Sequence, residues 1–108
     1  MNFMDILTVL NRKDIVIQKI IYHIELFNSF KNVYLFGSII SKKRNPNDID
    51  LLLIYEDFSS TLLRDLDEIR TIFDQLYGLS FDLNVLSETE EKESNFLSKL
   101  NPNYLRIK

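Results

Sequence analysis

Three short segments with the composition of β-strands alternate with segments of helical period, and this alternation predicts a fold in which helices pack against a sheet. Residues 33–36 form a continuous apolar run, as does the body of residues 48–55, which is typical of strands covered on both faces. Residues 81–86 instead alternate polar and apolar side chains, which indicates a strand with one polar face. The sequence therefore predicts a small central sheet of about three strands.

Four helices are expected around these strands. The first spans about residues 12–30 and the third residues 62–76, because apolar residues recur in both at spacings of three and four. A short second helix covers residues 39–41, and a weaker last helix runs from the capping-box pattern Ser87-x-x-Glu90 to about residue 99. The apolar stripes are Ile17, Ile20, Ile21, Ile24 and Phe27 in the first helix, and Leu62, Leu66, Ile69, Phe73 and Leu76 in the third. This order predicts one α/β (or α+β) domain over residues 1–108, with a mixed sheet flanked by helices.

Charge and composition narrow the function classes. The chain of 108 residues carries 13 basic and 16 acidic side chains, and its net charge of −3 disfavours the basic surface that non-specific nucleic-acid binding requires. It has no cysteine, so it has neither a disulfide framework nor a thiolate metal site. The longest uninterrupted apolar run, residues 51–55, is too short to cross a bilayer, and the N-terminus lacks a secretory n-region. We expect a cytoplasmic protein with neither membrane nor nucleic acid among its partners.

Glycine is scarce, because the chain has only two, Gly37 and Gly78. Gly78 directly follows the third predicted helix, where a left-handed residue ends helices most easily. Gly37 follows the first predicted strand, where a glycine lets the backbone come close to a phosphate group, and Ser38 adds a hydroxyl donor. The alternative for this pair is an ordinary strand-to-helix turn with Ser38 as the N-cap.

Three aspartates are candidate metal ligands. Asp48 and Asp50 open the second strand and, being two apart, project from the same face of it, so their oxygens suit Mg²⁺. Asp82 lies on the polar face of the third strand and reaches Asp50 if the two strands are neighbours. A solvated strand start and the open face of an antiparallel sheet are the alternatives. An Asp-x-Asp pattern alone says little, since Asp65 and Asp67 repeat it on a helix, where they point apart.

The combined pattern, Gly37-Ser38 followed after nine residues by Asp48-x-Asp50 and later by Asp82, resembles the nucleotidyltransferase superfamily typified by DNA polymerase β. The resemblance is greatest to its minimal nucleotidyltransferase branch and covers nearly the whole chain. It implies the nucleotidyltransferase fold, a nucleoside triphosphate held by Gly37 and Ser38, and two Mg²⁺ ions bound by Asp48 and Asp50. It also implies that Asp82 completes one metal site and helps to activate the attacking hydroxyl.

The segment after Ser38 departs from the family pattern. Members commonly continue with a small residue, a basic residue and another glycine, whereas this chain continues Ile39-Ile40-Ser41-Lys42-Lys43. Lys42 and Lys43 are candidate ligands of the β- and γ-phosphates, and a solvated basic loop is the alternative.

The resemblance implies a Mg²⁺-dependent enzyme that transfers a nucleoside monophosphate, with ATP the expected donor, to a hydroxyl of a partner protein or small molecule. It further implies a helical HEPN-type partner protein, in a toxin–antitoxin pair, or a second copy of the chain as the source of the acceptor surface. The alternative is a catalytically weak or inactive module of the same fold that acts by binding a partner. The eight Phe and five Tyr are interpreted as core residues, with base stacking as the alternative. His23 is assigned to a helix surface.

Overall fold

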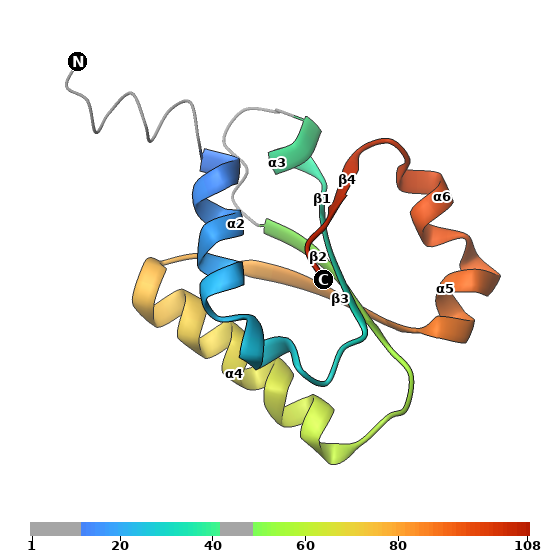
Figure 1. Ribbon diagram of the computed structural model, residues 1–108, viewed down its shortest axis with the longest axis horizontal. Coiled ribbons are helices and arrows are strands. Elements are labelled where there is room, and N and C mark those ends of the chain that lie inside the picture. The colour runs from blue at the N-terminus through green and yellow to red at the C-terminus, as the bar shows by residue number, and fades with distance from the viewer. Residues whose placement is uncertain (1–11, 42–48) are drawn as a thin grey trace.

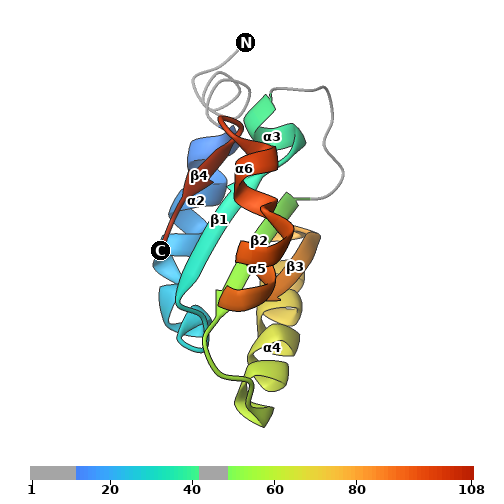
Figure 2. The same ribbon diagram turned by 90° about the vertical axis from the view of Figure 1, so that its right-hand side faces the viewer.

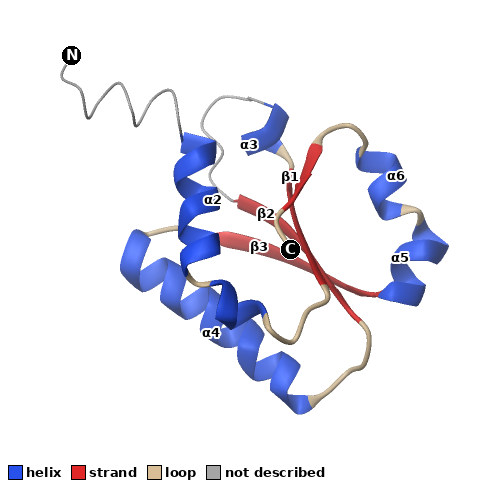
Figure 3. Cartoon of the chain, viewed as in Figure 1, coloured by secondary structure: helices blue, strands red, loops and turns tan. Residues whose placement is uncertain are grey.

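The computed structural model describes residues 12–41 and 49–108 (Figures 1 and 3). Its elements follow in chain order as α2 (Arg12–Tyr22), the 3₁₀ helix η1 (Ile24–Phe27), β1 (Asn32–Phe36), α3 (Ser38–Ser41), β2 (Ile49–Tyr55), α4 (Ser60–Tyr77), β3 (Phe81–Ser87), α5 (Glu88–Ser94), α6 (Phe96–Leu100) and β4 (Tyr104–Arg106). The expected α/β class is confirmed, with a mixed sheet flanked by helices.

The sheet has four strands in the order β3-β2-β1-β4. β1 is antiparallel to both β2 and β4, whereas β2 and β3 are parallel. The parallel pair requires a crossover connection, and α4 supplies it. The sequence predicts about three strands and gives no sign of β4, because a strand of three residues is too short to show an alternating pattern. β4 forms on the free edge of β1, where Ile107 also donates a backbone hydrogen bond to Val33 (2.8 Å).

One face of the sheet forms the core. Every second residue of the three longer strands points to this face, and all of them except Ser87, the last residue of β3, pack in one apolar cluster with residues of α2, η1 and α4. The strand residues are Val33, Leu35, Ile49, Leu51, Leu53, Tyr55, Phe81, Leu83 and Val85. Figure 2 shows α2 and α4 on this side of the sheet and α5 and α6 on the other.

The opposite face, called here the site face, carries the alternate residues. Leu52 and Ile54 are buried on it, although neither belongs to the main apolar cluster, because α5 and α6 lie over this side. The remaining strand residues that alternation places on this face are Asn32, Tyr34, Phe36, Asp50, Asp82, Asn84, Leu86, Tyr104 and Arg106. The polar residues of β2 and β3 among them, Asp50, Asp82 and Asn84, lie between the start and the middle of these strands.

Two local predictions are confirmed. Gly78 ends α4 in the left-handed conformation, with φ +62°, and its N–H donates to Asp74. Ser87 and Glu90 form both hydrogen bonds of a capping box at the start of α5, with lengths of 2.9 and 3.0 Å. Both features depend on residues close in sequence, so the sequence predicts them without knowledge of the tertiary structure.

The first and last predicted helices are each interrupted. The α-helical part of the first ends at Tyr22 and continues as η1. Ile21 is 54% exposed although the stripe placed it in the core, because the buried face of α2 runs through Val16 and Ile20. The last helix divides into α5 and α6 at Asn95, which is left-handed with φ +55°. Leu76, at the end of the α4 stripe, is 61% exposed.

His23 is half-buried between α2 and α4 rather than on an open helix surface. Its Nε2 lies 2.7 Å from the hydroxyl of Tyr77, and its ring meets that of Phe73 edge-on at 5.5 Å. The stripe could not show this contact because it joins residues 54 positions apart. Within the described parts of the chain, no helix is long and apolar enough to cross a membrane.

Candidate functional site

Asp50 and Asp82 are register partners on neighbouring strands. Each is the second residue of its strand, and because β2 and β3 are parallel, Asp50 pairs with Asp82 directly. Neighbouring strands lie about 4.8 Å apart, and paired residues project from the same face of a sheet. The two carboxylates therefore start side by side on the site face. Asp50 is half-buried and Asp82 is exposed.

Gly37 packs directly against the side chain of Asp50. It forms the turn between β1 and α3 with φ +82°, a conformation that L side chains rarely adopt. A Cβ atom at position 37 would lie 3.0 Å from Cγ of Asp50, 3.2 Å from its Cβ, and closer still to Oδ2. Phe36, the residue before Gly37, is the register partner of Asp50 on β1. The glycine, the turn and the aspartate therefore form one packed unit.

The other residues of the predicted site are placed in part or not at all. Ser38 begins α3, and Ile40 donates a backbone hydrogen bond to the carbonyl of Gly37 (3.1 Å). Asp48, Lys42 and Lys43 lie outside the described residues. Within residues 12–41 and 49–108, no group of three or more His, Cys, Asp or Glu side chains could hold a metal ion. The described residues contribute two neighbouring carboxylates, whose oxygen donors suit a hard cation such as Mg²⁺.

Asn84 is a further polar residue of this face that the sequence analysis did not assign to the site. It lies two residues after Asp82, on the same side of β3, and is the register partner of Leu52. Its Nδ2 donates to the backbone oxygens of Leu51 (3.4 Å) and Asp82 (3.5 Å), so the amide ties the start of β3 to β2. The alternation Asp82-x-Asn84 was the signal that could have found it.

Aromatic rings border the carboxylates on the β1 side. The ring of Phe36 meets that of Phe96, the first residue of α6, edge-on at a centroid distance of 5.6 Å and an angle of 82°. Tyr34 and Tyr104 form a similar pair beside them, also at 5.6 Å. Figure 2 shows α6 at the end of the sheet where α3 and the start of β2 lie. The site face is thus polar at the start of β2 and β3 and aromatic beside it, at Phe36 and Tyr34 of β1.

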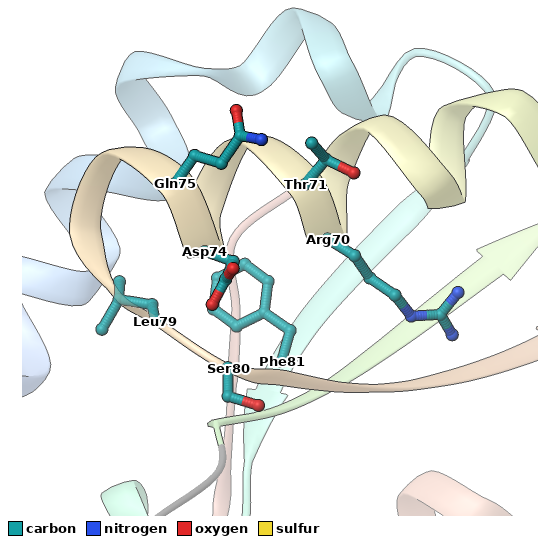
Figure 4. Close-up of a pocket in the computed structure, with 7 residues that line it drawn as sticks. All are labelled: Arg70, Thr71, Asp74, Gln75, Leu79, Ser80 and Phe81. Carbon is teal, nitrogen blue, oxygen red and sulfur yellow. The ribbon is translucent and has the colours of Figure 1, made fainter.

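A separate open pocket of 380 Å³ lies between the second half of α4 and the start of β3 (Figure 4). It is lined by Arg70, Thr71, Asp74, Gln75, Leu79, Ser80 and Phe81. Asp74 points toward the loop that carries Ser80, whereas Gln75 and Thr71 point the other way. Phe81 belongs to the core face, so this pocket opens on the other side of the sheet from Asp82.

Comparisons with known proteins identify a fold and a family. The sequence profile of a family described as "Family of unknown function (DUF6932)" matches residues 4–103. A solved structure described as "Crystal structure of putative nucleotidyltransferase" superposes with a TM-score of 0.51 and 19% sequence identity, over 83% of this chain and 98% of that one. No curated protein matches the chain. Together with the mixed four-stranded sheet, the superposition shows that the chain has a nucleotidyltransferase-like fold.

Proposed function

Because the chain belongs to the DUF6932 family of unknown function, we propose its activity from the site itself: it is a Mg²⁺-dependent nucleotidyltransferase. It transfers a nucleoside monophosphate, with ATP as the expected donor, to a hydroxyl group. The observation that carries this proposal is the pairing of Asp50 with Asp82 beside the Gly37 turn, in a chain with a nucleotidyltransferase-like fold.

The proposal assigns separate tasks to the residues of the site. Asp48, Asp50 and Asp82 would hold two Mg²⁺ ions, and the described pair fits this task because both donors are carboxylate oxygens on one face. Bound Mg²⁺ supplies charge neutralisation at the phosphates. Because Gly37 has no side chain, the triphosphate would come close to the backbone there. The hydroxyl of Ser38 would donate to a phosphate oxygen, and Lys42 and Lys43 would bind the β- and γ-phosphates as flexible cations.

Asp82 is the expected base because it is the more exposed of the two described carboxylates. The acceptor oxygen forms a bond to the α-phosphorus, the bond from that phosphorus to the bridging oxygen breaks, and pyrophosphate leaves. The proton of the acceptor hydroxyl passes to the carboxylate of Asp82.

The acceptor is the second part of the proposal. We expect a partner surface, either a helical protein of the HEPN type encoded beside this chain or a second copy of the chain. Transfer of AMP to such a partner would make the chain the antitoxin of a toxin–antitoxin pair.

The test uses ATP labelled at the α-phosphate, Mg²⁺ and the product of the neighbouring gene. Label should appear on that product or on the chain, and Asp82→Asn should reduce the rate by about 10²-fold or more, the usual contribution of a general base. Asp67→Asn is the matched control, because it makes the same change in the exposed Asp-x-Asp of α4. Labelling that survives Asp82→Asn, or that Asp67→Asn reduces equally, would contradict the assignment.

A specific observation favours a second candidate, a module that binds a partner without catalysis. Ile39 is buried and Ile40 packs against the core, so apolar side chains fill the start of the segment that is small and basic in nucleotidyltransferases of this kind. For such a module, ATP with Mg²⁺ should leave the unfolding temperature unchanged while the partner raises it. If ATP with Mg²⁺ raises the unfolding temperature and Asp50→Asn abolishes this rise, the result favours the enzyme over the binding module.

A further inference from the structure

We propose that Phe36 and Phe96 form a stacking subsite for the base of the bound nucleotide. This inference rests on the proposed function and deepens it, because it says on which side of the carboxylates the nucleoside lies. From the sequence, the aromatic residues are expected in the core, with base stacking as the alternative. The structure separates this pair from the buried phenylalanines.

The two rings differ in burial from the phenylalanines of the main apolar cluster. Phe27, Phe30, Phe73 and Phe81 are all buried in the main apolar cluster, together with residues of both helices on the core face. Phe36 and Phe96 are half-buried and belong to neither the buried cluster nor the apolar residues packed against it. Part of each ring is therefore accessible, on the side of the sheet that carries Asp50 and Asp82.

Their position follows from the strand register. Phe36 is paired with Asp50 on the adjacent strand, and paired residues of antiparallel strands project from the same face. Asp82 pairs with Asp50 from the other side. Across the site face, the order is therefore Asp82, Asp50 and Phe36, one strand apart each time, with Phe96 edge-on against Phe36.

This order of residues indicates on which side of the carboxylates the nucleoside of the bound nucleotide lies. The triphosphate belongs at the carboxylates and the Gly37 turn, so the nucleoside extends toward either β3 or β1. On the β3 side the site-face residues after Asp82 are Asn84 and Leu86, neither of which offers a ring. On the β1 side lie the half-buried rings of Phe36 and Phe96, and stacking on an aromatic ring tolerates every base because all bases have a π-face.

The experiment uses the absence of tryptophan from the chain. In Phe96→Trp, the single indole should be quenched by ATP with Mg²⁺ but not by tripolyphosphate with Mg²⁺, which has the phosphates and no base. Tripolyphosphate should nevertheless compete with ATP and reverse the quenching. Phe58→Trp is the matched control, since Phe58 is 64% exposed and contacts Tyr55 at the other end of β2, and ATP should not quench it.

Affinity supplies an independent measurement. Phe96→Leu keeps an apolar side chain and should weaken ATP about tenfold while leaving tripolyphosphate unchanged, and Phe96→Tyr should restore ATP binding. Circular dichroism shows whether each variant is folded. If ATP and tripolyphosphate bind the unaltered chain equally well, or Phe96→Leu weakens both alike, the stacking subsite is wrong and the nucleotidyltransferase proposal stands. If neither ATP nor tripolyphosphate binds the unaltered chain, the stacking subsite and the nucleotidyltransferase proposal are both wrong.

Discussion

Gly37 and Asp50 are in direct contact across the β1–β2 pair, and the glycine is the residue that leaves room for the carboxylate. A side chain at position 37 would overlap Oδ2 of Asp50, and the backbone there has φ +82°. The position of a candidate metal ligand on β2 is therefore set by a backbone turn at the end of β1. This contact explains physically why one of the two glycines of the chain lies at this turn.

Replacing Gly37 by alanine should destabilise the fold for two reasons. The left-handed conformation costs a residue with a Cβ about 1–2 kcal/mol, and overlap with Asp50 adds about 1–3 kcal/mol of overpacking. Gly78→Ala is the matched control because Gly78 also has positive φ but open space around it, so only the first cost applies. Urea unfolding should rank Gly37→Ala as the more damaging change. Equal free energies of unfolding for the two variants would show that the overlap is relieved without cost.

The overlap itself can be isolated by a double-mutant cycle. Asp50→Ala removes Cγ and Oδ2, the atoms nearest to the added Cβ. In that background, Gly37→Ala should cost less than in the unaltered chain, by about the overpacking energy of 1–3 kcal/mol. Additive effects of the two substitutions would contradict the contact.

Asp82→Asn should stabilise the chain when no divalent metal is present. Like charges on directly paired residues destabilise a sheet by about 0.2–1 kcal/mol, and this substitution removes one charge of the Asp50–Asp82 pair. In EDTA the unfolding temperature should therefore rise by a few degrees, whereas Mg²⁺ should raise that of the unaltered chain only. Scanning calorimetry with and without Mg²⁺ measures both effects. A variant less stable than the unaltered chain in EDTA would mean that Asp82 contributes more to the fold than repulsion costs.

Features with local signals could be predicted from the sequence. The stripe of α4, the left-handed Gly78 and the capping box of Ser87 and Glu90 each depend on residues a few positions apart. Alternation along residues 81–86 predicted the polar side of β3, and with it the face that carries Asp82.

Features that depend on tertiary pairing could not be predicted. β4 exists because β1 offers a free edge, and its three residues carry no pattern of their own. The Gly37–Asp50 contact requires the antiparallel register of β1 and β2, and the contact of His23 with Tyr77 requires the packing of α2 on α4. The aromatic border of the site likewise needs α6 to fold back over β1.

The capping box makes stability depend on pH. The backbone N–H of Ser87 donates to Oε1 of Glu90 (2.9 Å), and this bond, with a smaller contribution of the Ser87 hydroxyl to the same carboxylate, lowers the pKa of the Glu90 carboxyl below its usual 4.5. Between the two pKa values the unfolded chain binds more protons, so stability rises with pH there. The contribution is complete above 4.5 and is lost as the pH falls through the lowered value. Urea unfolding of Glu90→Gln against the unaltered chain, from neutral pH down to about pH 3, should show a shallower acid decline for the variant. Parallel pH profiles would contradict this linkage.

Lys108 holds the end of β4 against the turn that follows η1. Its Nζ donates to the carbonyl oxygens of Phe27 (3.0 Å) and Phe30 (2.6 Å), and its backbone pairs with Val33. Lys108→Met keeps the aliphatic stem but removes the ammonium that donates both bonds. We expect a loss of about 1–3 kcal/mol because both carbonyls lose a charged donor, although the carbonyl of Phe27 also accepts from the N–H of Phe30 (3.0 Å). Lys99→Met is the control, since Lys99 is exposed on α6 and its loss should change the free energy of unfolding by less than about 0.5 kcal/mol.

The cost of Lys108→Met should be nearly independent of salt. Its ammonium meets neutral carbonyl groups at short range, whereas the exposed pair of Lys31 with Glu88 joins opposite charges that salt screens. High NaCl should therefore reduce the contribution of Lys31 to the free energy of unfolding and leave that of Lys108 unchanged. Urea unfolding at low and high NaCl measures both contributions. Amide hydrogen exchange at Val33, whose N–H donates to the Lys108 carbonyl at 3.1 Å, should accelerate in Lys108→Met. If exchange at Val33 stays as slow as in the unaltered chain, the backbone pairing alone holds β4, and the ammonium contributes nothing to it.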